Sequence, residues 1–292
     1  MKISPEYVGA VCKPLEVEVT ARQCMNYAAS IGDANTWHLD DAGAEGIVAP
    51  PMLAVALTWR ISERFLEFWG DNDFPYEALA RQVHYSERLQ WERPMRPGER
   101  LRIEGEVAAI LPHRAGTHLI IAYTAYDKNG STVFVEHTGG LLRGVICDGE
   151  GRGVDGLVEY NNAADAMPFW SKELHVSKLA AHIYDGCADI HFPIHISPAF
   201  AKSVGLPGIL LQGTATLAMA VREIIAVEAD NDPRRLRAVG ARFTGMVRPD
   251  SAISVRVLAK KETDNAQQCH FVVLNANGKP AISDGFVDIA AG

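Results

Sequence analysis

The chain has 292 residues, of which 48% are hydrophobic and 22% are charged, and this composition is typical of globular rather than disordered proteins. Its formal net charge of -8 at pH 7 argues against a nucleic-acid-binding protein, because such a protein needs a basic surface. The sequence has no run of about 20 apolar residues and no apolar signal-peptide core near its N-terminus, so we expect a cytoplasmic protein that does not enter a membrane.

The first motif along the chain is a polar segment that ends in histidine. Residues 27–38 read Tyr-Ala-Ala-Ser-Ile-Gly-Asp-Ala-Asn-Thr-Trp-His, and a segment rich in alanine and other apolar residues follows at 49–59. Alanine and leucine favour helices, so we predict a buried helix there. Alternating apolar residues at 101–107 then indicate a strand with one buried face, and Asn129-Gly130 indicates a two-residue hairpin turn.

The same four features recur in the same order further along the chain. Residues 183–195 form a second polar segment that ends in histidine, and residues 211–221 form a second apolar segment rich in alanine. Alternating apolar residues at 253–257 and the pair Asn277-Gly278 complete the series. We therefore predict an internal repeat, in which each copy pairs one buried helix with an antiparallel sheet.

The repeat sets the expected domain organisation. The first copy spans residues 1–147, the second spans 171–292, and residues 148–170 join them. The joining segment contains Gly151, Gly153 and Gly156 in the spacing of a dinucleotide-binding loop. No amphipathic crossover helix follows these glycines, so we interpret the segment as a linker.

The motif and the repeat together resemble a known family. The pattern Gly-Asp-x-Asn-Pro-x-His is typical of the MaoC-like dehydratases and R-specific enoyl-CoA hydratases, and residues 32–38 match it except that Thr36 replaces proline. The second copy keeps Pro193 and His195, lacks the asparagine, and has Asp189 six residues before the histidine instead of five. The resemblance implies an α+β protein with a double hotdog fold, in which two helix-wrapped antiparallel sheets are fused.

The resemblance also implies the site residues. In the first copy, Asp33 and His38 would form the acid–base pair, and Asn35 would orient them. In an alternative arrangement, His195 would act with Asp189 in the second copy. We favour the first arrangement, because acid–base catalysis depends on geometry and its spacing matches the family pattern.

Two further groups of residues are candidates for substrate binding. A helix N-terminus can stabilise an enolate oxygen, and the first free N–H groups of the two buried helices would be those of Met52 and Gly213, since Pro50-Pro51 precedes Met52. Arg234 and Arg235 could hold the phosphates of coenzyme A. A solvated surface, next to the aspartates that precede them, is an equally good explanation of these arginines.

The resemblance implies reversible hydration of 2-enoyl-CoA, which is the dehydration of (R)-3-hydroxyacyl-CoA in reverse, without a metal or a redox cofactor. His191 and His195 have a spacing that suits a metal on a helix, but Pro193 lies between them and argues against such a helix. A hotdog acyl-CoA thioesterase and a non-catalytic acyl-CoA-binding protein are the alternatives. Exposed sheet edges often pair, so we expect a homodimer.

Overall fold

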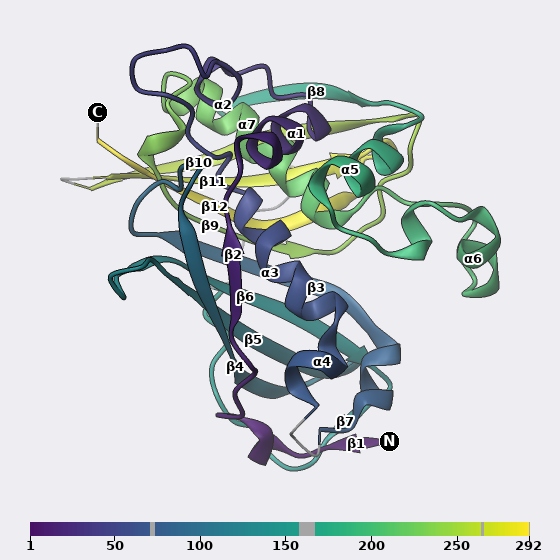
Figure 1. Ribbon diagram of the computed structural model, residues 1–292. Helices are drawn as coiled ribbons and strands as arrows, with labels where there is room; N and C mark the ends of the chain where they lie inside the picture. Colours follow the sequence, from purple (N-terminus) through teal and green to yellow (C-terminus); the bar gives the residue numbers. More distant parts are fainter. Residues whose placement is uncertain (71–73, 158–166, 264–265, 292) are drawn as a thin grey trace.

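The computed structural model describes residues 1–70, 74–157, 167–263 and 266–291, and it shows two similar α+β repeats joined into one sheet (Figure 1). Each repeat contains a long central helix and five strands of the shared sheet. Among the described residues, no helix has the length and apolar character needed to span a membrane.

The first repeat runs from the N-terminus to the middle of the chain. Its strands are β1 (Lys2–Ile3), β2 (Leu15–Glu18), β3 (Gln82–Trp91), β4 (Arg100–His113), β5 (Gly116–Tyr126), β6 (Thr132–Arg143) and β7 (Ile146–Cys147). Its α-helices are α1 (Ala21–Ser30), α2 (Thr36–Leu39), α3 (Leu53–Glu63) and α4 (Phe65–Trp69), and its 3-10 helices are η1 (Pro5–Tyr7) and η2 (Tyr76–Arg81).

The second repeat has the same plan. Its strands are β8 (Trp170–Val176), β9 (Leu236–Phe243), β10 (Ser251–Thr263), β11 (Ala266–Asn275) and β12 (Pro280–Ala290). Its α-helices are α5 (Ala180–Ala188), α6 (Pro198–Ser203) and α7 (Gly213–Glu228), and its 3-10 helices are η3 (Pro193–His195) and η4 (Pro233–Arg235).

The sheet itself shows the two-fold relation between the repeats. Its ten strands follow the order β2-β4-β5-β6-β3-β9-β12-β11-β10-β8, so each strand of one half has its counterpart at the matching place in the other. The halves meet where β3 pairs antiparallel with β9, from Ser86 opposite Arg242 to Gln90 opposite Ala238. Helices α1 and α5 also pack on each other across this junction, where the hydroxyl oxygens of Tyr27 and Tyr184 lie 3.1 Å apart.

The predicted helices and strands follow from the apolar pattern. In α3, seven of the eleven residues are buried, and in α7 nine of sixteen are, because small and aliphatic side chains face the sheet. Both helices begin later than the apolar segments that predicted them, at Leu53 after two prolines and at Gly213. The alternating residues of β4 and β10 are buried on one face, as their period of two indicates.

The two hairpin turns differ from the prediction. Asp127 pairs with Ser131 around a three-residue loop, and Asn275 pairs with Lys279 in the same way. Only the glycine of each Asn-Gly pair has positive φ, 80° at Gly130 and 69° at Gly278, so the two-residue turn that needs two such residues is not formed. The Asp127 carboxylate accepts bonds from two N–H groups of its own loop and so favours the longer turn.

The described part of the expected linker follows the sheet of the first repeat. Arg152 exchanges two backbone hydrogen bonds with Ile110 of β4, both 2.9 Å long. Asp155 pairs with Arg242 of β9 at 2.9 Å, which ties the segment to the second repeat. The glycines at 151 and 153 have positive φ and lie against β4, where a Cβ atom would meet backbone within 3 Å. Residues 158–166 of the expected linker lie outside the described residues.

Candidate active site

The first motif forms a tight loop between α1 and α2. Gly32 has a φ of 66° and ends α1, and the N–H of Asp33 bonds the Ala28 carbonyl at 2.8 Å. This is the usual way in which a left-handed glycine closes a helix. Asn35 then caps α2, because its side-chain oxygen accepts from the N–H of Trp37. Two capping residues thus fix the loop that carries the aspartate and the histidine.

Asp33 and His38 face each other in this loop. The His38 Nε2 atom lies 3.6 Å from Asp33 Oδ2, and both side chains are almost enclosed, with 2% and 12% of their surface exposed. His38 Nδ1 lies 2.8 Å from the Val48 carbonyl. A carbonyl can only accept, so Nδ1 carries the proton and Nε2 presents a lone pair to Asp33. Burial lowers the pKa of His38, while the Val48 bond and the charge of Asp33 oppose this effect.

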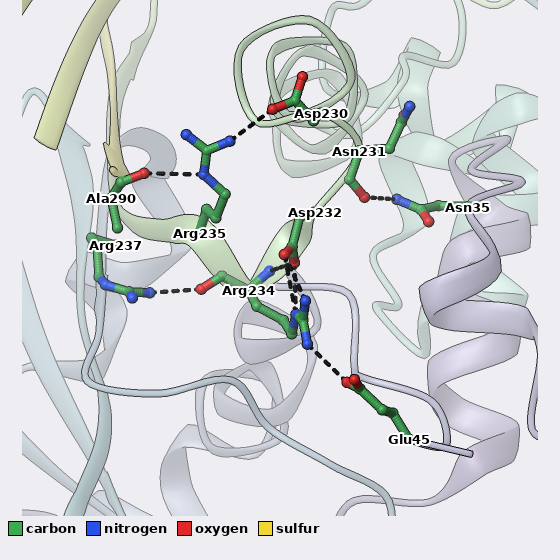
Figure 2. A network of polar contacts seen from close by, with 9 residues as sticks. All are labelled: Asn35, Glu45, Asp230, Asn231, Asp232, Arg234, Arg235, Arg237 and Ala290. Atoms are coloured by element: carbon green, nitrogen blue, oxygen red, sulfur yellow. Dashed lines mark hydrogen bonds and ion pairs between the residues drawn. The ribbon is translucent and has the colours of Figure 1, made fainter. Parts of the chain in front are cut away.

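Asn35 donates two hydrogen bonds that the sequence did not predict, one from its backbone and one from its side chain. Its backbone N–H donates to Asp33 Oδ1 at 3.0 Å and so orients the carboxylate. Its side-chain amide donates to the Asn231 carbonyl at 2.8 Å, in the second repeat (Figure 2). The candidate site of one half is therefore anchored to the loop that follows the central helix of the other half.

The start of α3 gives few free donors beside this pair. The N–H groups of Leu53 and Ala54 bond the carbonyls of Pro50 and Pro51, at 2.9 and 3.2 Å. Since prolines have no N–H, the backbone N–H of Met52 is the remaining candidate in this turn. Met52 itself is buried.

The second repeat places its histidine in the same way. His195 ends η3, and its Nδ1 lies 2.8 Å from the Leu210 carbonyl, as His38 Nδ1 does from that of Val48. In both halves the accepting residue comes shortly before the central helix. Helix α7 starts at Gly213 without a proline, and a helix leaves its first N–H groups without a partner inside the helix.

The expected partner of this second histidine is not in place. Asp189 has a φ of 60°, and its carboxylate bonds His191 Nε2 at 2.9 Å and lies 3.5 Å from Arg60. No hydrogen bond or ion pair joins Asp189 to His195 in the described structure. The extra residue between them, compared with the first motif, is accommodated by the left-handed conformation of Asp189, which directs its carboxylate elsewhere.

The two arginines proposed for phosphate binding lie at the junction of the halves (Figure 2). Arg234 bonds both oxygens of Asp232, pairs with Glu45 at 2.8 Å and stacks on the Trp37 ring with its guanidinium carbon 3.9 Å from the centroid. Arg235 pairs with Asp230 at 3.1 Å. Both guanidinium groups are thus already bound to carboxylates of the same chain, which favours a structural role over phosphate binding.

Sequence reasoning assigned no role to four buried polar residues. Gln212 precedes α7, and Asp185 lies on α5, where its charge acts on His195. Glu87 and Glu136 lie on the neighbouring strands β3 and β6. One signal was available for Glu87, because it shares the inward phase of β3 with the buried residue Leu89. Asp185 lies inside a helix, where a single aspartate gives no such signal.

Two protein-family descriptions match this chain, one in each repeat. Residues 6–136 match the dehydratase domain region of FAS1-like proteins, and residues 161–277 match the MaoC-like domain. The two matches cover corresponding parts of the two repeats.

Curated relatives are similar at low identity. The chain is 26% identical to the peroxisomal multifunctional enzyme type 2 of Drosophila melanogaster over 196 residues, which are 65% of this chain and 31% of that protein. It is also 26% identical to the enoyl-CoA hydratase ChsH3 of Mycobacterium tuberculosis over 179 residues, 61% of each protein. The chain thus spans less than two thirds of each of these relatives.

Solved structures confirm the expected fold. A MaoC-like dehydratase from Phytophthora capsici superposes with a TM-score of 0.84 at 20% identity, over 98% of both chains. A conserved Mycobacterium tuberculosis protein with a double hotdog fold gives a TM-score of 0.63 at 13% identity, over 97% of this chain and 96% of that one. The prediction of a double hotdog is therefore confirmed.

Proposed function

We propose that this chain, whose residues 161–277 match the MaoC-like domain, adds water across the double bond of 2-enoyl-CoA and catalyses the reverse dehydration of 3-hydroxyacyl-CoA. The observation that carries the proposal is the pair of Asp33 and His38, whose acceptor atoms face each other 3.6 Å apart. Two acceptors held this close need a donor beside them, and a water molecule supplies one.

Hydration at Asp33 and His38 needs no other group to carry the proton. The pair removes one proton from the water as its oxygen bonds the β-carbon of the enoyl group. Electrons of the double bond move toward the thioester and form an enolate. The pair then returns the same proton to the α-carbon, so that Asp33 and His38 end in their starting states.

The neutral state of His38 supports its role as a base. Burial lowers the pKa of His38, so the imidazole is uncharged at neutral pH and its Nε2 lone pair is free. The Val48 carbonyl fixes this tautomer through the other ring nitrogen. We assign the backbone N–H of Met52, at the start of α3, as the donor to the enolate oxygen.

A small apolar cavity, with room for about one water molecule, lies next to this centre. Its lining includes Val48 and Pro51 from the segment before α3, Met95 from the same repeat, and Leu236 from the second repeat. Both halves of the chain therefore meet beside the candidate pair.

The decisive experiment mixes the purified protein with crotonyl-CoA and follows enoyl absorbance and free thiol in parallel. Loss of absorbance without thiol is the expected result. Thiol release would identify a thioesterase, and no change of either signal would leave a binding protein. Each of these two outcomes contradicts the proposal.

Two variants locate the reaction. Asp33→Asn and His38→Ala should each lower the hydration rate by about 100-fold, the usual contribution of an acid–base group. Asp40→Asn changes an exposed carboxylate of the same loop and should keep the wild-type rate. Full activity in both site variants would show that Asp33 and His38 are not the catalytic pair.

A further inference from the structure

The start of α7 is built into a polar site with α5. The Gln212 amide nitrogen donates to the Ala181 carbonyl at 3.2 Å, and the Tyr184 hydroxyl donates to Thr214 Oγ1 at 3.1 Å. Ala181 lies one helical turn before Asp185. These two bonds hold the face of α5 that carries Asp185 against the first turn of α7.

His195 is fixed to the same place. Its Nδ1 donates to the Leu210 carbonyl, two residues before Gln212, and its Nε2 keeps a lone pair. Burial lowers the pKa of His195, and the negative charge of Asp185 acts on it in the opposite direction. The negative charge of Asp185 therefore favours the protonated form of this imidazole.

Two buried acceptor atoms at this site have no donor. Asp185 Oδ1 and Gln212 Oε1 make no hydrogen bond within the described part of the chain, although the residues are only 7% and 2% exposed. An unpaired buried acceptor is unfavourable, because it has lost its hydrogen bonds to water and gained none in the protein. Two unpaired acceptors beside the free N–H groups of a 16-residue helix indicate a place for a ligand that donates hydrogen bonds.

The other oxygen of Asp185 is held in place. Asp185 Oδ2 accepts from His191 Nδ1 at 2.9 Å, and Asp189 holds the second nitrogen of the same ring. The bond to Asp185 raises the pKa of His191, so the ring donates from both nitrogens when it is charged. His191 thus orients Asp185 and leaves Oδ1 for another partner.

We propose that the second repeat holds a second hydrating centre, in which Asp185, and not Asp189, is the carboxylate that acts with His195. This inference rests on the proposed function and adds a residue to it. Asp185 Oδ1 and Gln212 Oε1 accept the two hydrogens of the water, and the Gly213 N–H faces the thioester oxygen. One water proton passes to the Asp185–His195 pair as the oxygen bonds the β-carbon, and the pair returns it to the α-carbon.

The test uses the full chain with His38→Ala, in which the second centre supplies the residual hydration, about a hundredth of the wild-type rate. Residual hydration of crotonyl-CoA should fall by about 100-fold when Asp185→Asn or His195→Ala is added. Asp189→Asn is the matched comparison, because it removes a carboxylate from the same His191 ring without touching the centre. Asp189→Asn should lower the residual hydration rate much less than Asp185→Asn does. Thermal melting of each variant checks that the fold is kept.

Three results would overturn the inference. They are a His38→Ala protein without residual activity, a residual activity that Asp185→Asn leaves unchanged, and a loss in Asp189→Asn as large as that in Asp185→Asn. Failure of the proposed function would look different, since wild-type protein would then not hydrate crotonyl-CoA at all.

A measurement without substrate checks the geometry independently. Titration of His195 by NMR should show a lower pKa in Asp185→Asn than in wild-type protein, because a neighbouring negative charge is removed. Asp189→Asn should shift this pKa less. An unchanged His195 pKa in Asp185→Asn would contradict the assignment of Asp185.

Discussion

Replacing Glu87 by glutamine should stabilise the protein, and the gain should increase with pH. Glu87 and Glu136 are 0% and 1% exposed on adjacent strands, and their carboxyl groups interact with each other through a side-chain hydrogen bond. His84 Nε2 lies 3.1 Å from Glu87 Oε2 but also bonds the Ser86 carbonyl. Burial raises the pKa of Glu87 from 4.5 to about 8, and it raises that of Glu136 as well.

The sign of the effect follows from proton binding. Above pH 4.5 the unfolded chain releases the Glu87 proton, whereas the folded chain keeps it up to about pH 8. Stability from this group is therefore complete below pH 4.5 and is lost as pH rises toward 8, by about 1.4 kcal/mol per pH unit. At pH 7 the loss amounts to about 3 kcal/mol. Glutamine has a similar shape and cannot ionise, so Glu87→Gln removes this loss.

The assay is urea unfolding of both proteins from about pH 5 to about pH 8. The difference in unfolding free energy should increase by about 1.4 kcal/mol per pH unit in favour of the variant. Glu92→Gln, an exposed change just beyond the end of β3, is the control and should give a flat difference. A flat difference for Glu87→Gln, or a variant that is less stable near pH 8, would refute the reasoning.

Three further substitutions test other parts of the fold. Arg242→Ala leaves Asp155 without its 2.9 Å partner and should lower the unfolding free energy by about 3 kcal/mol; an unchanged melting temperature would contradict this. Asn35→Ala removes the cap of α2 and should cost about 1 kcal/mol in urea unfolding, whereas wild-type stability would show that the cap is dispensable. Gly105→Ala would place a Cβ atom 2.8 Å from the Tyr123 ring and should cost about 1–3 kcal/mol; a protein that melts like wild type would show that the ring can move.

Much of the fold was readable because local patterns carry it. The apolar segments at 49–59 and 211–221 predicted the two central helices, and alternating residues predicted β4 and β10. These patterns depend only on which face of a helix or strand is buried. They can therefore be recognised without knowing which segment packs against that face. The hairpin turns were predicted at the right places with the wrong length, because the side chains of Asp127 and Asn275 each accept two backbone N–H bonds and favour a longer turn.

Some contacts of the candidate site were also predictable from the sequence, and others were visible only in the structure. The sequence alone placed Asp33, Asn35 and His38 in one loop, since they lie within six residues. Only the tertiary structure showed that the Asp189 carboxylate bonds one nitrogen of His191, and that Asp185, on α5, bonds the other. A carboxylate's partner depends on helix packing and on the backbone conformation at one residue, and neither leaves a pattern in the sequence.

The repeat thus predicted the two copies and the location of the first motif, and the family resemblance predicted the fold class. The tertiary structure decided how the copies meet: β3 pairs with β9, and Asn35 of one half bonds the Asn231 carbonyl of the other. It also decided which polar groups are buried without partners. These features depend on contacts between segments that are distant in the sequence. The apolar pattern of each segment shows which face is buried, but not which other segment it contacts.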